Sequence, residues 1–229
     1  IAWLEVLLAL ARPEGQDEAI ARALALRPDG APALVLCATR RMARGDPAGA
    51  RADLDQAIRA DPRLGAAYFV RGLLRDQGND REGAIEDFSA AAGLCGDLAA
   101  PWFQSAVSRL AQGDSAGGLA DLDRALVIAP DLPDAWYWRS LARGRQGDLG
   151  GAAADAEVLI ERWPELWGGW FLRGNLLALR GERAGAIEDL SRALSRAPPG
   201  WIEHGRTLAL LHDLDPAGGG PTGESGASR

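Results

Sequence analysis

Aspartates that recur at one constant interval are the side chains in this sequence best placed to do chemistry. They are Asp53, Asp87, Asp121, Asp155 and Asp189. Arginines precede these aspartates at two fixed spacings. At the longer spacing, Asp87, Asp155 and Asp189 are preceded by Arg71, Arg139 and Arg173. At the shorter spacing, the first four aspartates are preceded by Arg41, Arg75, Arg109 and Arg143. A carboxylate can act as a general base, but active sites do not recur at regular intervals along a chain. The pattern therefore predicts ion pairs between each aspartate and arginines of a neighbouring helix, with a structural role.

The remaining reactive residues form no catalytic or metal-binding set. Cys37 and Cys95 fall at unrelated places in the period and lack the spacing of a zinc site or a disulfide framework. His204 and His212 are eight residues apart, which is about 12 Å along a helix and too far to share a metal without other ligands. No Ser-His-Asp set or phosphate-binding glycine pattern is present. We therefore expect no enzyme, no cofactor and no metal.

The composition narrows the class of partner. Of the 229 residues 47% are hydrophobic, too many for a disordered chain, and the net charge is −7. This acidic balance argues against nucleic acid and against an anionic membrane as partners. The apolar stretch from Leu4 to Ala11 is interrupted by Glu5, and no run approaches the ~20 residues of a membrane span. We expect a cytoplasmic protein, and the use of arginine without lysine suggests a bacterial source.

The recurring aspartates belong to a repeated unit that must position them. Units of equal length begin at Ala31, Gly65, Ala99, Pro133 and Trp167. Position 4 is large, positions 8, 20 and 27 are small apart from Leu159, and position 32 is Pro in four units. Positions 2–14 and 18–31 have helical length and composition, and Gly-Asp or its equivalent divides them. Each unit therefore predicts a helical hairpin whose helices cross closely at positions 8 and 20.

These positions resemble the tetratricopeptide repeat, which combines a period of about 34 residues with small residues at 8, 20 and 27 and Pro at 32. The resemblance implies an all-α fold, a right-handed α-solenoid of stacked antiparallel helix hairpins. Its five full units would be 31–64, 65–98, 99–132, 133–166 and 167–200. Residues 1–30 are interpreted as a divergent first repeat and 201–215 as a capping helix. Residues 216–229 are predicted to be disordered.

The resemblance also implies a concave groove, lined by the first helix of each unit, that takes a peptide or helix of a partner. The matching positions here are Phe69, Leu73, Asp76, Phe103, Val107, Tyr137, Leu141, Arg145, Phe171 and Asn175. Four rings in register would give an exposed apolar stripe suited to contact; alternatively, they are buried between helices. The family's carboxylate clamp needs lysine, which is absent, so an apolar segment is expected. Trp138, Trp163, Trp167 and Trp201 are interpreted as inter-unit packing or, alternatively, as a second aromatic contact patch.

The sequence therefore predicts a non-catalytic protein–protein interaction scaffold that binds a peptide or helix in an aromatic-lined groove. Two alternatives stay open. The chain could be the regulatory or substrate-recruiting region of a larger bacterial enzyme such as a kinase, or a module that associates with itself through its tryptophan-rich end. The oligomeric state is left open.

Overall fold

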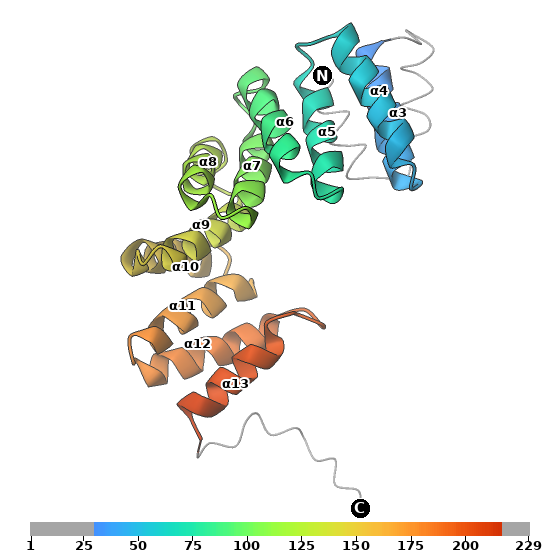
Figure 1. Cartoon of the computed structure of the whole chain (residues 1–229). Helices are drawn as coiled ribbons and strands as arrows, with labels where there is room; N and C mark the ends of the chain where they lie inside the picture. The colour runs from blue at the N-terminus through green and yellow to red at the C-terminus, as the bar shows by residue number, and fades with distance from the viewer. Residues whose placement is uncertain (1–29, 217–229) are drawn as a thin grey trace, which may run out of the picture. The chain divides into compact units, whose positions relative to one another are not determined.

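The chain is described by a computed structural model in which residues 30–216 are placed, and every regular element in that range is an α-helix (Figure 1). The first helices of the hairpins are α3 (Ala31–Ala43), α5 (Gly65–Gln77), α7 (Ala99–Ala111), α9 (Pro133–Arg145) and α11 (Trp167–Leu179). The second helices are α4 (Pro47–Ala60), α6 (Arg81–Leu94), α8 (Ser115–Ile128), α10 (Leu149–Arg162) and α12 (Arg183–Arg196). The last helix is α13 (His204–Leu214). Contacts divide the chain into two compact units at Pro130/Asp131, which are described separately as the N-terminal and the C-terminal unit.

The helices confirm the predicted hairpins and shift their bounds by one residue. Every first helix spans positions 1–13 and every second helix spans positions 17–30 of the repeat, one residue earlier than predicted. The cause at the second helix is the residue at position 16, which stands just before the helix as its N-cap. The carboxylates of Asp46, Asp80, Asp114 and Asp148 each accept a hydrogen bond from a backbone N–H three residues on. Glu182 makes no such bond.

A turn with one left-handed residue joins the two helices of each hairpin. That residue is the predicted glycine in four hairpins, at Gly45, Gly113, Gly147 and Gly181. In the second hairpin Asn79, with φ of 64°, takes this place and Gly78 does not. Asparagine tolerates this conformation better than most residues, because its short polar side chain bonds locally.

Glycine also recurs three residues after the capping aspartate, a feature that the sequence analysis missed. A Cβ added to Gly49, Gly117 or Gly151 would overlap the carboxylate of the cap. The capping hydrogen bonds from the N–H of these residues measure 2.9 Å. The cap and the glycine therefore work as a pair, and the signal was present in the sequence as glycine at position 19 of every unit.

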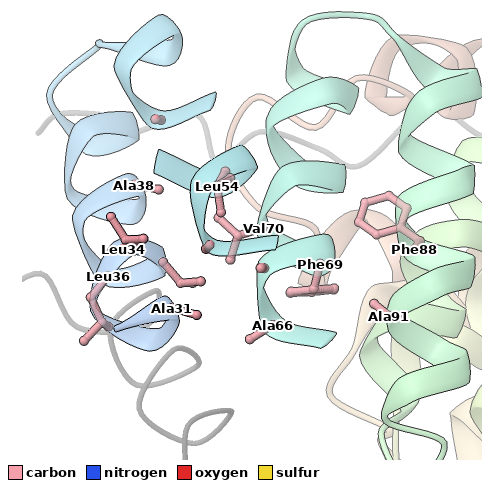
Figure 2. Packing of buried hydrophobic residues seen from close by; sticks show 14 of the residues in the cluster. Ala31, Leu34, Leu36, Ala38, Leu54, Ala66, Phe69, Val70, Phe88 and Ala91 are labelled. Atoms are coloured by element: carbon pink, nitrogen blue, oxygen red, sulfur yellow. The ribbon is translucent and has the colours of Figure 1, made fainter. Parts of the chain in front are cut away.

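Small side chains and two phenylalanines build the core of the N-terminal unit. Ala38, Leu54, Val70 and Phe88 are fully buried, and Figure 2 shows them packed between α3, α4, α5 and α6. A Cβ on Gly72 would lie 2.6 Å from the ring of Phe88. Glycine at position 8 is therefore what lets the α5–α6 crossing hold a phenylalanine.

In the C-terminal unit the α9–α10 crossing brings positions 8 and 20 together, as predicted. The hydroxyl of Ser140 donates to the carbonyl of Ala152 at 2.8 Å. Leu159, the exception to the small residue at position 27, is 2% exposed and packs with Ala156 and Leu172. Its larger side chain thus fills space in the core of this unit.

Of the predicted end segments, the structure describes the capping helix. The capping helix begins at His204, three residues later than predicted, and it packs on α12. Apart from Gly30 and Pro216, the predicted first repeat and tail lie outside the described residues. Among the helices that the structure describes, none combines the length and the apolarity needed to span a bilayer.

Candidate interaction site

The recurring aspartates form ion pairs inside each hairpin, and the arginines at positions 7 and 11 are their partners. The guanidinium of Arg139 donates to both carboxylate oxygens of Asp155, at 2.7 and 3.0 Å. Arg143 adds a third bond at 3.0 Å. The Asp155 side chain is 2% exposed and the Arg139 side chain 13% exposed. The pair is therefore largely desolvated, with the carboxylate satisfied by hydrogen bonds, as a buried charge requires.

The same arrangement recurs in the other hairpins with local changes. Arg173 binds Asp189 at 2.6 and 2.9 Å. Arg71 binds both oxygens of Asp87, and it also reaches Asp55 of the preceding hairpin at 2.8 Å. The hydrogen bond with Asp87 is the main reason that the pKa of Arg71 is raised.

Two hairpins lack arginine at position 7 and make weaker versions of the pair. Ser105 replaces that arginine in α7 and donates to Asp121 at 2.6 Å, with Arg109 at 3.0 Å. In the first hairpin Arg41 alone lies 3.1 Å from Asp53. Burial raises the pKa of Asp53, and the charge of Arg41 offsets part of that effect.

The predicted groove residues of the N-terminal unit are all buried or half-buried. Phe69 is only 4% exposed, and its ring centroid lies 5.8 Å from that of Phe88 (Figure 2). Phe69 is therefore a core residue and presents no ring to a ligand. Asp76 accepts a 3.0 Å hydrogen bond from Ser108 of α7. The predicted groove residues Leu73, Phe103 and Val107 are half-buried.

The predicted positions of the C-terminal unit come together around one pocket of about 540 Å³. Its lining includes all five of them: Tyr137, Leu141 and Arg145 of α9, with Phe171 and Asn175 of α11. The amide of Asn175 donates to the carbonyl of Phe171 at 2.7 Å, which fixes its orientation. The first helices of consecutive repeats thus supply an apolar wall and a polar edge to the same hollow.

The segment of the last helix also lines this pocket, which the sequence analysis did not foresee. Glu203, Arg206, Thr207 and Leu210 line it from the segment of α13. Arg206 is paired with Glu203 at 3.0 Å. Burial, and next the nearby charge of Glu203, raises the pKa of the Tyr137 hydroxyl. The sequence signal for these residues was weak, because α13 lies beyond the last full repeat and has no counterpart in register.

A run of touching rings backs the pocket. Trp167 lies 5.6 Å from Tyr137, 5.9 Å from Phe171 and 4.6 Å from Trp201, measured between ring centroids. Trp201 in turn meets Phe171 at right angles, 4.9 Å away. Trp167 and Trp201 therefore pack between repeats, which is the first of the two interpretations of the C-terminal tryptophans.

Within residues 30–216 the structure brings together no group of three or more histidine, cysteine or acidic side chains able to hold a metal ion. Cys37 and Cys95 are both free thiols. The groups that do cluster are aromatic, aliphatic and arginine side chains. Their arrangement suits contact with another molecule.

The comparisons with known proteins agree with this architecture. The model of the tetratricopeptide repeat matches residues 38–99, 103–166 and 139–200. The chain therefore belongs to the tetratricopeptide-repeat family, whose members serve as protein-interaction scaffolds. No curated protein matches the sequence.

Similar solved structures are themselves repeat proteins of this kind. PilF of Pseudomonas aeruginosa aligns with a TM-score of 0.74 at 16% identity, over 91% of this chain and 96% of PilF. YrrB, described as a TPR protein with an unusual peptide-binding site, aligns with a TM-score of 0.69 at 18% identity, over 85% of this chain and 97% of YrrB. MamA of Desulfovibrio magneticus RS-1 aligns with a TM-score of 0.66 at 17% identity, over 72% and 93%. At these identities the likeness concerns the fold.

Proposed function

We propose that the chain is a non-catalytic scaffold whose C-terminal unit binds an apolar peptide or helical segment of a partner protein. The bound segment would lie in the pocket formed by α9, α11 and α13. The observation that carries this proposal is the convergence of five predicted groove residues on that one pocket.

The size and lining of the pocket support a side-chain anchor. A volume of about 540 Å³ falls in the range of concave ligand sites, about 300–1,000 Å³. Tyr137, Phe171 and Leu141 offer apolar surface, and large aromatic residues are frequent energetic anchors of interfaces. An aliphatic or aromatic side chain of the partner would be desolvated against these groups.

The edge of the pocket supplies groups for the backbone of the bound segment. Arg145 is exposed, and its guanidinium makes no ion pair or hydrogen bond with any residue in the described part of the chain. Asn175 keeps its side-chain carbonyl available while its amide donates to Phe171. An arginine donor and an amide acceptor at one edge match the carbonyl and N–H groups of a peptide. YrrB, which has a similar fold, is described as having a peptide-binding site, and this is consistent with the proposal.

The proposal is tested by selecting peptides from a random library on the purified chain. Each selected peptide is then measured by calorimetry against Tyr137→Ala, Phe171→Ala and the matched control Leu179→Ala. Leu179 lies on the same helix as Phe171 but is 74% exposed, outside the pocket. We expect peptides with aromatic or aliphatic anchors whose affinity falls about tenfold or more in each pocket variant, as for anchors at interface centres.

The control variant should bind such peptides as the unchanged chain does. Circular dichroism shows whether each variant keeps its helices. Selected peptides that bind the Tyr137→Ala and Phe171→Ala variants undiminished would disprove the assignment of the pocket.

A further inference from the structure

A second pocket lies at the beginning of α9 and α11, and we propose that it binds a cationic side chain, arginine or lysine, of a partner protein. Its volume is about 230 Å³, and its lining includes Asp134, Tyr137, Trp138, Trp167 and Gly168. Tyr137 is the one residue that it shares with the larger pocket. The inference therefore goes beyond the proposed function and does not depend on it.

Three aromatic rings surround this pocket in orientations that suit a cation. The ring of Tyr137 meets Trp138 at 6.2 Å with an interplanar angle of 87°, and it meets Trp167 at 5.6 Å and 67°. In an edge-to-face pair one ring turns its edge to a face of the other, so each ring keeps at least one face turned away from that partner. A cation within about 6 Å of such faces is attracted by their negative quadrupoles, most strongly by tryptophan.

The same chemistry already occurs elsewhere in this unit. The guanidinium of Arg139 lies 4.7 Å from the ring of Trp136, that of Arg162 lies 4.6 Å from Trp163, and that of Arg192 lies 4.7 Å from Trp170. In contrast, no arginine within residues 30–216 lies over Trp138, Tyr137 or Trp167. These rings line the pocket, so a cation from outside meets no competing guanidinium of the described residues there.

A carboxylate at the pocket decides the charge of the ligand. Asp134 is exposed, and its carboxylate makes no ion pair or hydrogen bond with the residues that the structure describes. A neutral side chain in the pocket would leave this carboxylate without a partner of opposite charge. A guanidinium or ammonium group supplies that partner through a charge-assisted hydrogen bond. The net charge of −7 adds long-range attraction for a basic segment.

Glycine keeps the pocket open. A Cβ at Gly168 would lie 2.9 Å from Cδ2 of Tyr137, so any larger residue would displace the ring. Gly169 beside it lines the pocket as well. The backbone at the start of α11 therefore forms one wall, and the rings and the carboxylate form the others.

The test uses the blocked tripeptide acetyl-Gly-Arg-Gly-amide, with the citrulline tripeptide as its neutral counterpart. The chain is labelled with ¹⁵N, and the indole N–H signals of Trp138 and Trp167 are assigned from the Trp138→Phe and Trp167→Phe variants. We expect the arginine peptide to shift both signals with saturation in the millimolar range, the affinity that a single cation–π contact supports. The citrulline peptide should bind about fivefold more weakly or not at all, because it has the shape without the charge.

Two variants separate the carboxylate from the general charge of the chain. Asp134→Asn should weaken the arginine peptide about fivefold, since the paired charge is lost. Glu161→Gln removes an exposed carboxylate of α10 that does not line the pocket, and it should leave binding unchanged. Leu210→Ala, which alters the lining of the larger pocket away from these rings, should also leave the shifts in place. Equal binding of the citrulline peptide, an unchanged affinity in Asp134→Asn, or no shift with arginine would each overturn the proposal.

Discussion

The N-terminal and C-terminal units use the same repeat position for different purposes. Position 5 of the repeat is Phe69 in α5, where the ring is buried against Phe88. In α9 and α11 the same position is Tyr137 and Phe171, where the rings line a pocket. An aromatic residue at this position therefore serves as core or as binding surface according to its surroundings.

The residues that begin the next repeat account for the difference. The repeat after that of α5 begins with Ala99 and Ala100, and Ala100 packs against the core cluster that contains Phe69. The repeat after that of α9 begins with Trp167 and Gly168, so that a large ring contacts Tyr137 and the glycine packs beside it, where a Cβ would collide with the ring. Trp201 stands in the same place after α11 and meets Phe171. Each pocket ring is thus held from behind by tryptophan.

The largest expected effect comes from removing the buried ring. Phe69→Ala should lower the free energy of unfolding by about 3–5 kcal/mol, because it leaves a cavity beside Phe88. Phe171→Ala, the matched change in the C-terminal unit, should cost less, because that ring is half-buried. Urea unfolding followed by circular dichroism measures both. Equal losses would mean that the two units do not differ as described.

The ion pairs offer the next comparison. Asp155→Ala should lower the free energy of unfolding by about 2–4 kcal/mol, since it strands two arginines around a buried position. Asp121→Ala in the N-terminal unit should cost about half as much, because its partners are Ser105 and a single arginine. Thermal and urea unfolding of the two variants test this order. If Asp121→Ala melts at the same temperature as the unchanged chain, the interaction of Asp121 with Ser105 and Arg109 does not stabilise the fold.

Two glycine substitutions should act with opposite signs. Gly168→Ala should destabilise the chain by about 1 kcal/mol, because the new Cβ collides with the ring of Tyr137. Gly93→Ala on α6 meets nothing within 4 Å, and it should stabilise the chain by about 0.5–1 kcal/mol through helix propensity. Urea unfolding again gives both values. A neutral or stabilising Gly168→Ala would show that Tyr137 moves freely at that pocket.

The sequence predicted the hairpins well because their determinants are local and repeated. A capping aspartate, a left-handed glycine and small residues at positions 8 and 20 act within one unit, so five copies reinforce one interpretation. The partners of the recurring aspartates also followed from spacing, since positions 7, 11 and 23 have fixed places in a hairpin. The one-residue error in the helix bounds arose because the turn residues alone do not show which of them is the cap.

The site was less predictable because it depends on contacts between repeats. The aromatic residue at position 5 did not by itself predict that Phe69 is buried, because its burial also depends on the small residues, such as Ala100, that begin the next repeat. The contribution of Glu203, Arg206 and Leu210 depends on how a helix without repeat register packs. The pocket around Asp134 combines two consecutive repeats, and no single unit carries its pattern.

The smallest expected effect is a dependence on pH that belongs to the C-terminal pocket. Burial, assisted by the charge of Glu203, raises the pKa of Tyr137 above its ordinary value of 10.0. The folded chain then holds the hydroxyl proton more tightly than the unfolded chain does. This contribution to stability is complete below the ordinary pKa and is lost as the pH rises through the folded pKa.

As the pH rises through the ordinary pKa and then the folded pKa, the unchanged chain should therefore lose more stability than Tyr137→Phe, which cannot titrate. Urea unfolding at a series of such pH values measures the difference. The difference in tyrosinate absorbance between the unchanged chain and Tyr137→Phe locates the pKa, because it removes the signal of Tyr68. Glu203→Gln should bring that pKa part of the way back toward 10.0 by removing the smaller of the two causes. A parallel loss in the unchanged chain and in Tyr137→Phe would mean that the hydroxyl is solvated, and a bound side chain would then meet water in the pocket rather than a desolvated ring.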